Sequence, residues 1–264
     1  MLRAENLSVQ YRWRQEPVLR GVNAEFEGRC LLLGPNGSGK TTLFRVFSGL
    51  TPPKTGKALI DGEDVTKIFG RVGALATNLP EVYNLFFLNA YDHVVAYSDI
   101  LGGDPDRAFE FMERLGLMRD YLRKRKPWEL SGGQRKAFTT GLALSVRARN
   151  TLLDEPFEQL DPAKKAWLAE KLSSVEGTLV VNTHETWVLK PFRDWVTYLI
   201  FEGRAYGPVK AGDLLESRLV KGRVEDAVIT FEASGKVFSL VRGEEGSPLT
   251  ELVTLDRVYE AGMG

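Results

Sequence analysis

Apolar and polar residues alternate at the start of the chain. The runs "LSVQY" and "VNAEFEG" repeat with the period of two that is typical of half-buried strands. The next run, "RCLLLG", is continuously apolar in its middle, which indicates a buried strand. Residues 1–33 are therefore predicted to form strands, the last of which leads into a glycine-rich loop.

Helix-like and strand-like runs alternate through the rest of the chain up to about residue 210. Apolar residues at spacings of three, as at Phe109, Met112 and Leu115, indicate helices, and short apolar runs between turn residues indicate strands. The predicted elements are helix 40–50, a short strand within 51–65, strand 71–77, a helical region 84–126, helix 131–147, strand 151–154, helix 162–175, strand 178–183 and strand 196–201. Strands that alternate with helices are typical of a parallel sheet.

The last part of the chain has a different pattern. Two alternating runs, "AVITFEA" and "KVFSLVR", are separated by "SG", which predicts a hairpin. We expect one large α/β domain over residues 1–210, with a helical subdomain at about 82–147, and a small β-rich appendage over 211–264. The appendage is too short to be expected to fold alone, so it should pack on the larger domain.

The balance of charge excludes some partners. The 264 residues contain 35 Lys+Arg and 35 Asp+Glu, so nucleic acid is not expected as a partner. The basic run "RKRK" at 123–126 is interpreted as a solvated helix end. The single cysteine, Cys30, cannot form an internal disulfide, and its place before "LLLG" predicts a buried thiol in a reducing compartment.

Neither targeting nor membrane-spanning segments are predicted. The N-terminal residues lack the apolar core of a signal peptide. The most apolar long window, 82–101, is interrupted by polar residues such as Asn84, Asp92 and Asp99, which a lone membrane-spanning helix would not tolerate. We therefore expect the chain itself not to cross a bilayer.

The strongest motif is "GPNGSGKT" at 34–41, which matches G-x-x-x-x-G-K-[ST]. Gly34, Gly37 and Gly39 let the backbone curl so that its N–H groups and the next helix N-terminus face a β-phosphate. Lys40 would reach the β- and γ-oxygens, and the Thr41 hydroxyl would bind Mg²⁺. The motif predicts a nucleoside triphosphate site, and an ordinary glycine-rich turn is the alternative.

Two adjacent carboxylates end the strand "TLLDEP". Asp154 at the strand tip would hold Mg²⁺ through a water, and Glu155 could orient or deprotonate the attacking water. The alternative is a solvated acidic turn closed by Pro156. His184 follows another apolar strand, so it is expected at the same edge of the sheet, where we favour a sensor of the γ-phosphate over a structural histidine.

A second glycine-rich stretch, "ELSGGQRK", lies at 129–136. Ser131 is a good N-cap, and Gly132 and Gly133 would expose backbone N–H groups at a helix start. The stretch is therefore either a second anion site or only a capped helix.

Taken in order, the aromatic Tyr11, "GPNGSGKTT", "LSGGQ", "LLDEP", "LD" and "H" resemble the ATP-binding cassette (ABC) ATPase family, from about Leu2 to Gly207. The resemblance implies an α/β P-loop NTPase with an ABC-type antiparallel β subdomain, a mostly parallel core sheet and an α-helical signature subdomain, with a small β-rich C-terminal appendage. It also implies ATP and Mg²⁺ as cofactors, and a head-to-tail dimer in which "LSGGQ" grips the ATP held by the partner's first loop.

The resemblance further implies roles for individual residues. Tyr11 would stack on adenine, although Trp13 is close enough to compete, and the ATP-binding loop would comprise Gly34, Pro35, Asn36, Gly37, Ser38, Gly39, Lys40, Thr41 and Thr42. The loop directed at the partner's ATP would be Leu130, Ser131, Gly132, Gly133 and Gln134, with Asp161 between the two sites. The catalytic group would be Glu155, His184 and Lys40. The metal ligands would be Thr41 and Asp154, with Asn78 as a further candidate.

Three positions depart from the family pattern. Glu158 stands where serine is usual, and Ala137 stands where an arginine is common. The usual glutamine after the strand "RVGAL" has no clear counterpart, and Thr77, Asn78 and Glu81 are all candidates. Lys40, Asp154, Glu155 and His184 are unaffected, so an active enzyme is expected.

The family implies an ATPase subunit that is cytoplasmic and peripheral on the cytoplasmic face of the membrane. It would pair as a homodimer or heterodimer with a second ABC ATPase and drive integral-membrane transporter subunits. "LPEVY" and "VTLDRVYEAG" favour export over import, although a compact single cassette also suits importers. Tyr83, Phe86, Phe87, Tyr91 and Tyr97 either pack the helical subdomain or form a groove for the membrane subunit. The alternatives are an ABC ATPase acting in ribosome, repair or iron-sulfur assembly, and an ATP sensor with poor turnover.

Overall fold

The computed structural model describes residues 1–68, 70–83, 87–252 and 254–258. The chain forms two compact units, and we describe each by itself: a first unit of residues 1–67 and 182–264, and a second unit of residues 68–181. Phe86 and half of "VTLDRVYEAG" (residues 253 and 259–262) lie outside the described residues, so their predicted roles stay predictions.

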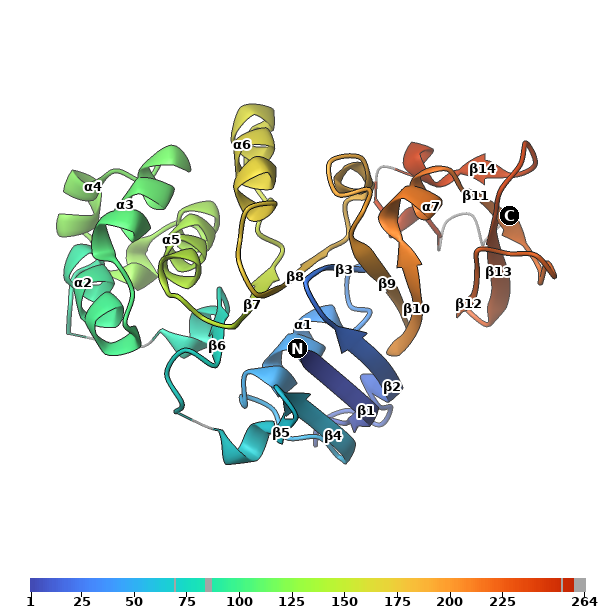
Figure 1. Ribbon diagram of the computed structural model, residues 1–264, viewed down its shortest axis with the longest axis horizontal. Coiled ribbons are helices and arrows are strands. Elements are labelled where there is room, and N and C mark those ends of the chain that lie inside the picture. Colours follow the sequence, from blue (N-terminus) through green and yellow to red (C-terminus); the bar gives the residue numbers. More distant parts are fainter. Residues whose placement is uncertain (69, 84–86, 253, 259–264) are drawn as a thin grey trace. The chain divides into compact units, whose positions relative to one another are not determined.

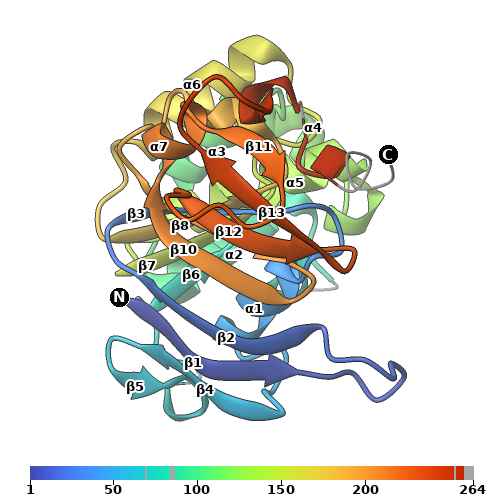
Figure 2. The same cartoon turned by 90° about the vertical axis from the view of Figure 1, so that its right-hand side faces the viewer.

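The first unit begins with an antiparallel sheet in the order β2-β1-β4-β5. Its strands are β1 (Leu2–Val9), β2 (Leu19–Phe26), β4 (Thr55–Ile60) and β5 (Glu63–Asp64). Leu2 lies opposite Phe26 on one side and Ile60 on the other, and all three side chains are buried. The alternation in the sequence therefore marks the inward face of this sheet, and Figure 2 shows β1 between β2 and β4.

The strand predicted before the glycine-rich loop is β3 (Arg29–Leu33), which pairs in parallel with β9 (Val196–Phe201). Strand β10 (Arg204–Lys210) pairs antiparallel with β9, and helix α1 (Lys40–Phe47) follows the loop. Cys30 is completely buried in β3, as predicted. Burial raises the pKa of its thiol to about 11, so the thiol stays protonated and unreactive near neutral pH.

The C-terminal part of the first unit is a four-stranded sheet in the order β12-β13-β11-β14. After helix α7 (Ala211–Leu215) come β11 (Arg218–Lys221), β12 (Ile229–Ala233), β13 (Lys236–Val241) and β14 (Ser247–Pro248). The predicted hairpin is confirmed as β12–β13, and its turn residues Ser234 and Gly235 have φ of 52° and 69°. Phe231 stacks on Phe201 of β9 with ring centroids 4.3 Å apart, so this sheet packs on the preceding strands.

In the second unit, β6 (Leu75–Thr77) and β7 (Asn150–Asp154) pair in parallel. The next strand along is β8 (Thr178–Thr183), which belongs to this unit as far as Val181. Helix α6 (Pro162–Leu172) connects β7 to β8. Strand β6 is shorter than the predicted 71–77, because Gly73 has a left-handed φ of 78° that extended backbone does not adopt.

The region predicted as helical between 84 and 126 contains three helices in its described part: α2 (Ala90–Leu101), α3 (Pro105–Arg114) and α4 (Arg119–Arg123). They gather with α5 (Gly132–Ser145) into one bundle (Figure 1). A Cβ on Gly141 of α5 would lie 2.7 Å from Cγ of Met112, so glycine permits the close approach of α5 to α3. Over the residues that the structure describes, no helix is long and apolar enough to cross a membrane.

Most of the predicted aromatic cluster packs inside this bundle. Tyr83 donates a hydrogen bond to the Thr77 carbonyl at 2.6 Å, and its ring meets the edge of Tyr97. Tyr91 stacks on Phe109. Phe87, by contrast, is 93% exposed. Of the described members, Phe87 is therefore the one that the bundle leaves largely exposed, and its contact with a partner stays a prediction.

Candidate functional site

The glycine-rich loop predicted at 34–41 joins β3 to α1 within the first unit. A Cβ on Gly34 would lie 2.3 Å from the carbonyl oxygen of Ile200. Gly39 has a φ of 110°, and a Cβ there would lie 2.7 Å from Cδ2 of Leu19. Only glycine fits at these two positions, so the loop passes close to its neighbours before turning into the N-terminus of α1.

Lys40 is the cation of this loop. Its side chain is buried, and Nζ donates hydrogen bonds to the carbonyl oxygens of Gly34 at 2.7 Å and Pro35 at 3.0 Å. The ammonium group is thus held against the loop that its own motif forms. Thr41 follows on the exposed side of the first turn of α1, whereas Thr42 is buried.

The two aromatic candidates for base stacking form one stack. The rings of Tyr11 and Trp13 lie 4.8 Å apart with an interplanar angle of 12°. Burial raises the pKa of Tyr11, but hydrogen bonds from Thr42, Arg45 and Thr51 outweigh this and leave the pKa below its usual value. Tyr11 is therefore tied to the region around α1, and Trp13, which is 79% exposed, presents the outer ring face.

In the second unit, Asp154 ends β7 and is nearly buried. Its backbone N–H donates to Oδ1 of Asn78 at 2.7 Å, and its carbonyl oxygen accepts from Nδ2 of Asn78 at 3.1 Å. The amide oxygen of Asn78 therefore accepts a backbone hydrogen bond in the interior, which does not fit the predicted role of Asn78 as a metal ligand. Of the other two candidates for the missing glutamine, Thr77 is buried and Glu81 is exposed.

Lys136 of α5 also contacts this strand end. Its Nζ donates to the Asp154 carbonyl oxygen at 2.8 Å and lies 3.9 Å from Oδ2 of the same residue. The next residue, Glu155, has a left-handed φ of 45°, which is uncommon for a side chain other than glycine. The side chains of Asn78 and Lys136 therefore hold the backbone at Asp154, where the pair of carboxylates begins.

The stretch "LSGGQ" forms the N-terminus of α5 in the second unit. Ser131 caps the helix, because its Oγ accepts from the N–H of Gln134 at 3.3 Å, and Oε1 of Gln134 accepts from the N–H of Ser131 at 3.0 Å. A Cβ on Gly133 would lie 2.8 Å from Oε1 of Gln159. Leu130 is buried beneath the loop. The predicted N-cap is confirmed, and Gly133 lies where the loop passes close to the Gln159 side chain.

Asp161 caps α6 in the same unit. Its carboxylate accepts from the N–H of Lys164 at 3.0 Å and pairs with Nζ of Lys164 at 3.0 Å. The backbone hydrogen bond from Lys164 holds the pKa of Asp161 below its usual value. Glu158, where serine was expected, is exposed.

His184 follows β8 directly, in the first unit. The residue before it, Thr183, accepts a hydrogen bond from the N–H of Gly34 at 3.2 Å, so His184 is one residue from a contact with the glycine-rich loop. The chain's other histidine, His93, is buried in α2, and burial lowers its pKa to about 4. His93 is therefore neutral at pH 7 and belongs to the helical bundle.

Sequence reasoning missed one contact of the glycine-rich loop at 34–41. The carboxylate of Asp256 accepts hydrogen bonds from Asn36, through the backbone N–H at 2.8 Å and through Nδ2 at 3.3 Å. The adjacent Leu255 donates its N–H to the carbonyl oxygen of His184 at 3.0 Å. No motif marks Asp256, because its partner in the loop lies 220 residues earlier in the chain.

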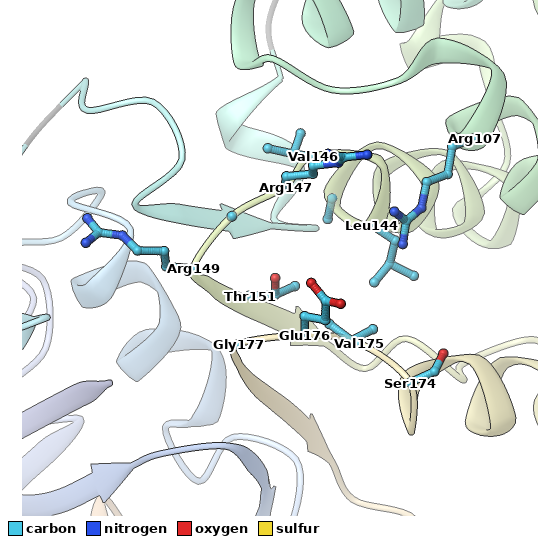
Figure 3. Close-up of a pocket in the computed structure, with 12 residues that line it drawn as sticks. Arg107, Leu144, Val146, Arg147, Arg149, Thr151, Ser174, Val175, Glu176 and Gly177 are labelled. Carbon is cyan, nitrogen blue, oxygen red and sulfur yellow. The ribbon is translucent and has the colours of Figure 1, made fainter.

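A pocket of about 560 Å³ lies elsewhere in the second unit (Figure 3). It is lined by Arg107 of α3 and by residues just before β7 and β8, including Arg147, Arg149 and Glu176. Asp154 lies at the other end of β7. None of the predicted site residues lines this pocket. The predicted catalytic residues Glu155 and His184 instead follow the carboxyl ends of β7 and β8.

The chain is similar to proteins of known kind. The family profile described as ABC transporter matches residues 22–158. "Energy-coupling factor transporter ATP-binding protein EcfA" of Methanoculleus marisnigri is 34% identical over 206 residues, which cover 72% of each chain. The protein of the same name from Methanosphaera stadtmanae is 29% identical over 274 residues, which cover 95% of each chain.

Among solved structures, one described as that of a "Cobalt transport ATP-binding protein (cbiO-2)" superposes with a TM-score of 0.89. It is 32% identical and covers 98% of this chain, with 99% of its own chain matched. The predicted P-loop fold of the ABC type, with its C-terminal appendage, is thereby confirmed.

Proposed function

The chain belongs to the ABC transporter family and is an ATPase, and on that premise we propose that it powers a membrane transporter through ATP-driven head-to-tail dimerisation. The names of the EcfA relatives and of the cobalt transport protein support a transporter of the energy-coupling factor kind. These names do not support the direction of export that the motifs "LPEVY" and "VTLDRVYEAG" favoured. The subunit would work at the cytoplasmic face of the membrane, beside integral-membrane partner subunits.

We propose that the loop from Gly34 to Thr42 holds the triphosphate, with Lys40 as its fixed cation and the Tyr11–Trp13 stack as the surface for the base. Glu155 would orient or deprotonate the attacking water, and His184 would sense the γ-phosphate. These roles are supported by the position of each side chain at a loop that follows a strand.

Mg²⁺ is the proposed metal, with Thr41 and Asp154 as its protein ligands. Hydroxyl and carboxylate oxygens suit this hard cation, which usually keeps several waters and takes other ligands from the phosphates. The described part of the chain contains no group of three or more His, Cys, Asp and Glu that could hold a metal by itself. That donor set fits an ion that arrives with the nucleotide and neutralises charge on its phosphates.

The observation that carries the proposal is the pair of glycine-rich helix N-termini, one before α1 and one before α5. Each presents backbone N–H groups to an anion. Ser131 and its glycines belong to a different unit from the loop with Lys40, and in the proposed head-to-tail dimer a second copy of the chain supplies them to a shared ATP. ATP would then favour the closed dimer by mass action.

The test is the mass of the Glu155→Gln protein in light scattering, without nucleotide, with Mg-ADP and with Mg-ATP. Only Mg-ATP should shift the mass toward twice 29.5 kDa. Ser131→Arg in the same background should block the shift, because it places bulk and charge where the anion binds. Ser174→Arg, at an exposed serine of the same unit, is the control and should leave the shift intact. A dimer that is indifferent to nucleotide or to Ser131→Arg would contradict the proposal.

For residues 211–264 we propose a stabilising appendage of the domain formed by residues 1–210. Its last described segment, Thr254 to Val258, contacts the two loops that would bind ATP, through Leu255 at His184 and through Asp256 at Asn36. Leu255 and Val258 are buried. The segment would therefore hold the ATP-binding loops in place.

Asp256→Ala is expected to lower Tm of the nucleotide-free protein by about 2–4 °C, since losing these bonds costs on the order of 1 kcal/mol. ATP affinity should stay within a few-fold of the original value. Differential scanning fluorimetry and calorimetry measure the two quantities, with Asp226→Ala at an exposed loop of the appendage as the control. An unchanged Tm in Asp256→Ala would remove the proposed stabilising role.

A further inference from the structure

The Asn78 side chain continues the pairing of β6 with β7 beyond the last residue of β6. Thr77 is the last residue of the parallel register and lies opposite Leu152, and the N–H of Asn78 donates to the Leu152 carbonyl oxygen at 3.3 Å. The amide of Asn78 then bonds both the N–H and the carbonyl oxygen of Asp154. One side-chain amide thus takes the place of a strand backbone at the end of β7.

The same amide reaches the helix that begins with "LSGGQ". Nδ2 of Asn78 donates to Oγ1 of Thr140 at 3.1 Å, and Lys136, one turn earlier in α5, donates to the Asp154 carbonyl oxygen. Asn78 and Thr140 are both 0% exposed. Without water to replace a lost partner, breaking one bond leaves a buried polar group unsatisfied. The network therefore fixes the position of Asp154 against α5.

The backbone changes direction directly after this network. Glu155 has a φ of 45°, a left-handed conformation that costs energy for a residue with a side chain and persists where surrounding contacts enforce it. Asn78 holds both backbone polar groups of the residue just before it. Loss of the amide would allow the peptide at Asp154 to rotate, and the direction of the Glu155 side chain would change with it.

We propose that Asn78 is a positioning residue that sets the orientation of the Asp154 and Glu155 carboxylates for ATP hydrolysis. The inference rests on the proposed roles of those two carboxylates. From the sequence, Asn78 is one of three candidates for the missing glutamine and a candidate metal ligand. The positioning role differs from both.

Asn150 offers a matched control, because it is also a fully buried asparagine that ties the same two strands. Its Nδ2 donates to the Ala74 carbonyl oxygen at 3.0 Å, at the amino end of β7 and away from Asp154. Asn78→Ala and Asn150→Ala should both lower Tm. Only Asn78→Ala should lower kcat, by about 10–100-fold, the scale of misplacing a reacting group by roughly 1 Å.

Steady-state kinetics and nucleotide binding separate positioning from folding. In Asn78→Ala, KM and Kd for ATP should stay within about threefold of the original values, since the group lost acts on turnover and not on uniform binding. Asn78→Asp is the second variant, which keeps the size of the side chain but replaces the amide by a carboxyl group. It keeps an acceptor for the Asp154 N–H but turns an oxygen toward the Asp154 carbonyl, so kcat should fall here too.

The proposal is overturned if kcat of the folded Asn78 variants is within about threefold of the original, or if Asn150→Ala loses as much turnover as Asn78→Ala. Glu155→Gln, measured in parallel, distinguishes this failure from that of the proposed function. Full turnover in Glu155→Gln would refute the role of Glu155 itself. Lost turnover in Glu155→Gln with full turnover in both Asn78 variants would refute only the positioning role.

Discussion

Lys40→Ala is expected to weaken Mg-ATP binding by about 100-fold or more, which removes useful binding at ordinary ATP concentrations. Lys40 is the fixed cation of the loop at 34–41, where its ammonium is held by the carbonyl oxygens of Gly34 and Pro35. Charge-assisted hydrogen bonds contribute about 1.5–3 kcal/mol each, and the triphosphate would lose this donor without a replacement.

Isothermal titration calorimetry with Mg-ATP measures the effect. Lys57→Ala is the matched control, because Lys57 is an exposed lysine of β4 in the same unit and is no part of the loop. Its affinity should equal that of the original protein. Equal ATP affinity in Lys40→Ala and the original protein would show that this loop is not the nucleotide site.

Features that depend on neighbouring residues could be predicted from the sequence. The glycine-rich loop was found because the glycines, the lysine and the preceding apolar strand occur within one short stretch, and the structure gives steric reasons for Gly34 and Gly39. The β12–β13 hairpin was found for the same reason, since Ser234 and Gly235 accept the positive φ that the turn requires.

Features that depend on distant residues could not be predicted. Asn78 was a candidate metal ligand because its residue type and its place after a strand allow that role. What decides its role is a bond to Asp154, 76 residues later, and the sequence does not encode that contact locally. The pairing of Asp256 with Asn36 was missed for the same reason.

Element boundaries were wrong where a single residue ends an element. The predicted strand 71–77 begins only at Leu75, since Gly73 is left-handed. The helical region 84–126 is divided after α2 ends at Leu101, because the next residue, Gly102, has a left-handed φ of 66°. Apolar spacing identified the inward faces of these elements but not their ends, because a positive φ leaves no trace in hydrophobic periodicity.

Glu155→Gln is expected to lower ATP turnover by about 10²–10⁴-fold, the scale of losing a positioned general base, while ATP binding is kept. The substitution preserves the shape of the side chain and removes only its charge and basicity, so the left-handed backbone at Glu155 is not disturbed.

Phosphate release under saturating Mg-ATP measures turnover, and calorimetry with the same nucleotide measures binding. Glu158→Gln provides the control, because it makes the same chemical change at an exposed glutamate three residues later, and it should retain turnover. If Glu155→Gln hydrolyses ATP at the original rate, the base lies elsewhere. His184→Ala would then be the next variant to measure, since His184 follows β8 directly and its preceding residue contacts the glycine-rich loop.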